Sequence, residues 1–164
     1  MPIILGIDPG LLHTGWGVIS AEGNSIRYLS SGTISPTAKL PLPERLHHIY
    51  LELKQVIANY HPDQCAVEEV FVNKNSGSSL KLGHARGVAL LSGATCGIPI
   101  NEYATTLVKK SIVGVGRAEK HQVEMMVRHL LPGCKVDSSD AADALAVAIC
   151  HFSHSSLKAK IKSS

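Results

Sequence analysis

The spacing of apolar residues divides the chain into an opening set of strands and a longer alternating part. Residues 3–8, 15–20 and 26–34 are strand-like apolar segments separated by short turns that contain glycine. Three strands joined by such short turns predict an antiparallel meander. Between 41 and 62, apolar residues recur every three or four positions, which predicts an amphipathic helix.

Helices and strands alternate in the rest of the chain. The patterns predict, in order, a strand at 64–71, a helix within 75–97, a strand at 98–103, a short helix at 105–112, a helix ending near 131 and a last helix starting near 138. This order predicts an α/β fold with a mixed five-stranded sheet flanked by helices. We expect one domain over 1–155 and a short, basic, flexible tail over 156–164.

Composition narrows the class of protein. The 164 residues are 45% hydrophobic and 18% charged, which excludes a disordered chain. No apolar run approaches the ~18 residues that cross a membrane, and the first residues lack the features of a secretion signal, so we expect a cytoplasmic protein. Residues 73–120 hold seven basic and two acidic side chains. Such a stretch suits a nucleic acid partner, although an ordinary solvated face explains the charge alone equally well.

Acidic residues stand where the pattern predicts burial. Asp8 ends the first strand, Glu68 and Glu69 lie in the strand at 64–71, and Asp140 and Asp143 share one face of the last helix. Side chains alternate along a strand, so only one of the two glutamates can join Asp8, and periodicity leaves open which one.

Each acid also has an ordinary explanation on its own. Asp8 could start a hydrogen-bonded turn, the glutamates could lie on a solvated edge, and the two helix acids could complement the helix dipole. One site for Mg²⁺ or Mn²⁺ explains all of them, because clustered carboxylates repel unless a hard cation lies among them. Two such ions activate water at a phosphodiester, so acids beside basic residues indicate a nuclease.

Four segments then resemble a known family. The segments GIDPG…TGWGVI, AVEEVFVNKNSGSSLKLGHARGVALL, VKKSIVGVGRAEKHQV and DAADALAVAI are similar, in order and spacing, to the bacterial RuvC Holliday junction resolvases. The resemblance implies a ribonuclease H-like fold, a homodimer and Mg²⁺-dependent paired nicking of four-way DNA junctions, with two ions expected in each site. It also implies work alongside a branch-migration complex of the RuvA and RuvB type.

The resemblance also implies roles for particular residues. It places the metal-binding set on Asp8, Glu68, Asp140 and Asp143, which decides between the two glutamates, and places Lys109 and Lys120 near the scissile phosphate. It places a DNA-stacking aromatic at Phe71, for which a core phenylalanine is the alternative. The basic stretch at 73–120, and not the resemblance, supplies the other expected DNA contacts: Lys74, Lys81, Arg86, Lys110 and Arg117.

Two features of the sequence and two alternative functions remain beside this resemblance. Leu11 and Leu12 stand where relatives frequently have a polar residue and an arginine. The glycines at 83 and 87 match a helix that pairs with its twofold mate, or they pack closely on their own sheet. A non-catalytic DNA-binding protein of the same fold is the alternative function, although it would be expected to lose at least one acid. A phosphotransferase of the actin type would need a second such domain.

Overall fold

The computed structural model describes residues 1–69 and 76–163. Its strands are β1 (Ile3–Asp8), β2 (Thr14–Glu22), β3 (Ser25–Ile34), β4 (Gln64–Glu69) and β5 (Ile100–Ala104). Its helices are α1 (Leu42–Tyr60), α2 (Ser76–Ala94), α3 (Thr105–Val113), α4 (Lys120–Leu130) and α5 (Ser139–Lys162). No helix in these ranges is long and apolar enough to cross a bilayer.

The five strands form one mixed sheet in the order β3-β2-β1-β4-β5. β1, β2 and β3 are antiparallel neighbours, whereas β4 and β5 run parallel to β1. The predicted fold class is therefore confirmed. The parallel pairing matters for function because the carboxyl ends of β1 and β4 meet at one edge of the sheet.

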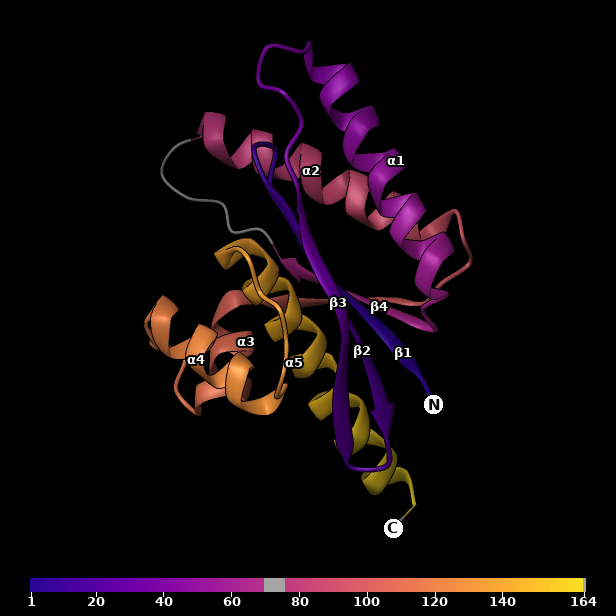
Figure 1. Cartoon of the computed structure of the whole chain (residues 1–164), viewed down its shortest axis with the longest axis vertical. Helices are drawn as coiled ribbons and strands as arrows, with labels where there is room; N and C mark the ends of the chain where they lie inside the picture. The colour runs from indigo at the N-terminus through magenta and orange to yellow at the C-terminus, as the bar shows by residue number, and fades with distance from the viewer. Residues whose placement is uncertain (70–75, 164) are drawn as a thin grey trace.

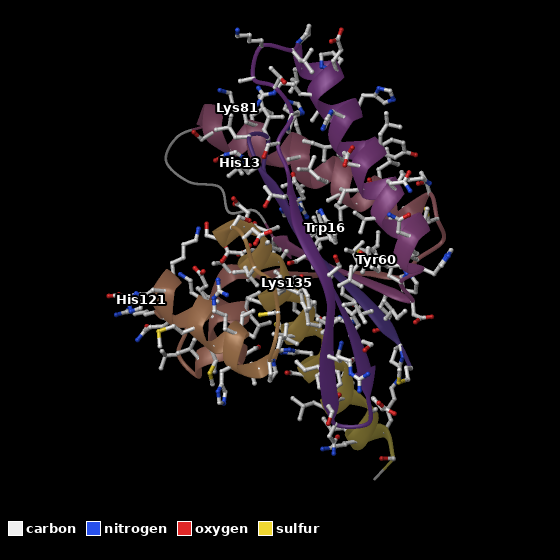
Figure 2. All side chains as sticks on the ribbon, viewed as in Figure 1. His13, Trp16, Tyr60, Lys81, His121 and Lys135 are labelled. Atoms are coloured by element: carbon white, nitrogen blue, oxygen red, sulfur yellow. The ribbon has the colours of Figure 1, made fainter. Side chains whose placement is uncertain are left out.

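Helices cover both faces of the sheet (Figure 1). α1 and α2 pack on one face over a core that includes Leu5, Ile7 and Val67. α3, α4 and α5 pack on the other face, where Ile4 and Ala66 point. Figure 2 shows the labelled Trp16 and Tyr60 side by side, with ring centroids 6.1 Å apart. The two cores alternate along each strand, as side chains of a sheet must.

α5 crosses the sheet at very close range, which explains two glycines. A Cβ at Gly6 would overlap the carbonyl oxygen of Ala144, and a Cβ at Gly15 would overlap that of Asp140. The side of α5 that meets the sheet is correspondingly rich in buried alanines. Glycine on the strands and alanine on the helix therefore fix how far α5 stands from β1 and β2.

Local signals set the C-terminal end of α1 and the N-terminal end of α5. α1 ends where His61 adopts a left-handed conformation, immediately before Pro62. α5 begins after Ser138, whose side chain accepts a hydrogen bond from the Ala141 amide at 3.1 Å. Residues 156–162, expected to belong to a flexible tail, are helical as the last turns of α5. Their flexibility in solution stays a prediction.

Candidate active site

The sheet brings two of the predicted acids together. Ile7 pairs with Val67, so Asp8 and Glu68 stand one residue further along two adjacent parallel strands. Both side chains point to the face that α5 covers, and their carboxyl groups are hydrogen bonded to each other. Glu69 is exposed and lies on the opposite face, within electrostatic range of Arg86. The structure thus places Glu68, and not Glu69, beside Asp8.

The first turns of α5 bring the other two acids to the same place. Asp140 and Asp143 are half-buried, and both act electrostatically on Asp8. The close packing of Gly15 on the backbone of Asp140 holds the start of the helix against β2. Four carboxylates from three elements are therefore grouped at one edge of the sheet.

The grouped carboxylates strongly disfavour one another's charge. Burial, followed by the field of Glu68, raises the pKa of Asp8 from 3.8 to about 10. Burial also raises the pKa of Asp143 to about 6, although Lys120 acts in the opposite direction. The Lys120 ammonium lies 3.3 Å from the Asp143 carboxylate, and that charge raises the pKa of the lysine. At neutral pH the cluster therefore holds a proton or needs a cation.

The donor set fits a hard divalent cation. All four groups offer carboxylate oxygens, which Mg²⁺ and Mn²⁺ prefer. Burial and the neighbouring acids raise the pKa of Asp8, so a cation among the four groups would stabilise their charged forms. The side chains do not form a closed cage as they stand, since no three Asp, Glu, His or Cys residues in the described ranges are grouped closely enough to hold an ion. Water or substrate oxygens would therefore complete the coordination of a bound ion.

Beside the acids lies a recess that we call the lysine hollow. It is lined by Glu68, Thr105, Val108, Lys109, Lys120, Val123, Asp143 and Ala146. Lys109 and Lys120, both predicted from the sequence, thus line the same recess as Glu68 and Asp143. Thr105, which the sequence analysis missed, donates a hydrogen bond of 2.8 Å from its hydroxyl to Glu68. The signal that could have identified Thr105 in the sequence is its position, because it begins α3 directly after β5.

The remaining predicted DNA contacts are placed differently. Lys81, Lys110 and Arg117 are exposed. Arg86 forms a two-pronged ion pair with Glu102, with nitrogen–oxygen distances of 2.5 and 2.8 Å, so much of its charge is compensated locally. Phe71 and Lys74 lie outside the described residues.

The comparisons with known proteins match this arrangement. The profile of the family described as crossover junction endodeoxyribonuclease RuvC matches residues 4–151, nearly the whole chain. The chain belongs to the RuvC family. A RuvC relative from Paramagnetospirillum magneticum is 56% identical over 158 residues, covering 96% of this chain and 95% of that protein. A RuvC relative from Rhodopseudomonas palustris is 53% identical over 159 residues, covering 97% and 91%.

Solved structures extend the comparison to the fold. The Thermus thermophilus RuvC in complex with Holliday junction substrate has a TM-score of 0.90 and 31% identity, covering 96% of this chain and 97% of that one. The yeast mitochondrial Holliday junction resolvase Ydc2 has a TM-score of 0.63 at 14% identity, covering 94% and 81%. The second likeness concerns the fold alone. The RuvC family and the ribonuclease H-like fold expected from the sequence are both confirmed.

Proposed function

We propose that this chain is a structure-selective DNA endonuclease that resolves Holliday junctions in recombination and repair. The observation that carries the proposal is the grouping of four carboxylates beside two lysines, in a chain of the RuvC family. A relative of 31% identity has been solved with a Holliday junction as its substrate. A non-catalytic scaffold is disfavoured, because nothing in a scaffold requires mutually repelling buried acids.

The acids fit Mg²⁺, and we expect two ions in each site. Asp8, Glu68, Asp140 and Asp143 would hold them; the ions would supply an activated water and stabilise charge on the departing oxygen. In the hydrolysis a water oxygen joins phosphorus, one phosphorus–oxygen bond to a sugar breaks, and the released sugar oxygen takes a proton. Lys109 and Lys120 face this reaction from the lysine hollow, where their ammonium groups hold the phosphate and offset developing negative charge.

A homodimer would present two such sites to a junction of twofold symmetry. The outward face of α2 supports it: Leu80 and Leu91 are 64% and 54% exposed. On the same face, a Cβ at Gly83 or Gly87 would meet no described atom within 4 Å. The glycines therefore do not serve close packing on their own sheet, which was the alternative. Action in the bacterial cytoplasm with RuvA- and RuvB-type partners completes the proposal.

Two neighbouring glutamates give a matched test of this function. Glu68→Gln keeps the shape of the side chain but removes a charge that would hold the ions, so nicking of a mobile junction should fall by about two orders of magnitude or more. Glu69→Gln, on the opposite face, should retain most activity. The rates are compared in single turnover with Mg²⁺ and saturating protein.

The substrate is tested with the same preparation. Junction, nicked duplex, flap and RNA/DNA hybrid are offered in parallel, and we expect paired nicks in the junction. If Glu69→Gln proves inactive while Glu68→Gln cleaves, the assignment of the site is wrong. Equal cleavage of all four substrates would refute junction selectivity.

A further inference from the structure

A second recess borders the same acids from the other side, and we call it the turn hollow. Its lining includes Asp8, Leu11, His13, Arg45, Lys81 and Asp140. Figure 2 shows its labelled members Lys81 and His13 close together near the start of α2, whereas the labelled His121 lies on α4. The four carboxylates are therefore divided between two recesses. Asp8 and Asp140 border the turn hollow, and Glu68 and Asp143 border the lysine hollow.

The turn hollow has its own positive charge. Lys81 is exposed at its rim, and the Arg45 guanidinium reaches in from α1. One terminal nitrogen of Arg45 donates to the Leu11 carbonyl at 3.1 Å. Its Nε is buried and has no hydrogen-bond partner among the described residues. That buried Nε is closed to an incoming ligand, but the guanidinium, anchored at one terminal nitrogen, lines the hollow and presents its positive charge to an acceptor there.

The surroundings restrict what that acceptor can be. Beyond the ions that the four acids would hold, a further cation is disfavoured next to Arg45 and Lys81, whose charges would repel it. A free small anion is opposed by the nearby carboxylates of Asp8 and Asp140. A phosphate that belongs to a longer chain meets neither objection, because it is delivered to the hollow by its covalent neighbour at the cleavage point.

We propose that the turn hollow binds the backbone of the cleaved DNA strand on the side of the cleavage point opposite to the side held by Lys109 and Lys120. This inference rests on the proposed nuclease function and adds Arg45 to the residues that contact substrate. The strand then crosses the carboxylates from one hollow to the other, with a phosphate anchored on each side. Two anchors fix the register of the strand over the acids.

The test pairs single variants with single neutral phosphates. Methylphosphonates replace, one at a time, the phosphates that flank the cleavage point of a junction, and affinity is measured with Ca²⁺ in place of Mg²⁺. For the wild type we expect about a three- to tenfold loss at sensitive positions on both sides. Lys81→Met and Arg45→Gln should each abolish the sensitivity on one side only, and Lys109→Met that on the other. The glutamine keeps a polar side chain at this position but removes the charge.

Arg27→Met is the matched control, because Arg27 is exposed on β3, paired with Ser20 far along the strand from the acids. It should leave every sensitivity unchanged. The proposal is overturned if Lys81→Met and Arg45→Gln alter the same side as Lys109→Met, or if neither alters any position. Junction cleavage by the wild type is recorded first, and its absence would refute the proposed function itself.

Discussion

Neutralising Asp8 should make the metal-free protein more stable while destroying the site. The carboxyl has a pKa of about 10 in the folded chain against an ordinary value of 3.8. Between these values the folded state keeps a proton that the unfolded state releases, so stability falls as pH rises through this range. Asp8→Asn imitates the protonated form without that penalty. The stability gain should be absent below about pH 4 and grow as pH rises.

The size of the gain follows from the same shift. Each pH unit above the ordinary pKa costs about 1.4 kcal/mol, which sets a ceiling of about 4 kcal/mol at neutral pH. The hydrogen bond to Glu68 shares the proton between two groups, and relaxation around them lowers the cost further. We therefore expect about 1 to 3 kcal/mol, or a rise in Tm of about 2 to 12 °C for a chain of this size.

The assay is urea and thermal unfolding in chelator, at about pH 5, pH 7 and pH 9. Asp137→Asn is the control, since Asp137 is exposed just before α5, and its effect should stay within about 0.5 kcal/mol. Added Mg²⁺ should then stabilise the wild type more than Asp8→Asn. An Asp8→Asn protein that is less stable than the wild type, or a gain that does not change with pH, would refute this account of the cluster.

Three further predictions concern single contacts. Gly15→Ala should lower the free energy of unfolding by about 1 to 3 kcal/mol and slow cleavage, because the new Cβ meets the Asp140 backbone. The control Gly116→Ala, whose new Cβ has its nearest contact at 3.4 Å, should be tolerated, and urea unfolding and nicking rates compare the two variants. Thr105→Val removes the donor to Glu68 and should slow single-turnover cleavage about tenfold or more, with Thr105→Ser restoring the rate; equal rates for both variants would exclude a positioning role. Gly87→Leu should weaken self-association in sedimentation runs, and a wild type that sediments as a monomer at micromolar concentration while making coordinated paired nicks would contradict the dimer.

Periodicity was sufficient for most of the fold, because the two helix-covered faces of the sheet impose regular apolar spacing. Periodicity could not predict the order of the strands, because the pairing of β4 with β1 depends on contacts between residues about sixty positions apart. The choice between Glu68 and Glu69 needed that same pairing, together with knowledge of which face α5 covers. The resemblance to a family supplied the choice before the sheet explained it.

Contacts between distant elements account for the rest of what the sequence missed. Arg86 was expected at DNA from the local excess of basic residues, but its partner Glu102 comes from a strand that periodicity does not connect to α2. Thr105 and Arg45 carried no signal by composition, and each gains significance only from the group that it meets in the fold. Leu11, unexpected as a replacement for a polar residue, is 7% exposed and belongs to the core.

The packing of α5 against the sheet has a consequence for the hydrogen exchange of its backbone amides. Residues 144–150, directly after the two acids, are all buried, and they pack on the central strands. The backbone amides that follow Asp143 should consequently exchange only when the whole domain opens, and not by local fraying of the helix. Displacing the helix that carries Asp140 and Asp143 therefore costs the free energy of unfolding the whole domain. Destabilising changes far from the acids should lower the fraction of folded enzyme while leaving the turnover of each folded molecule intact.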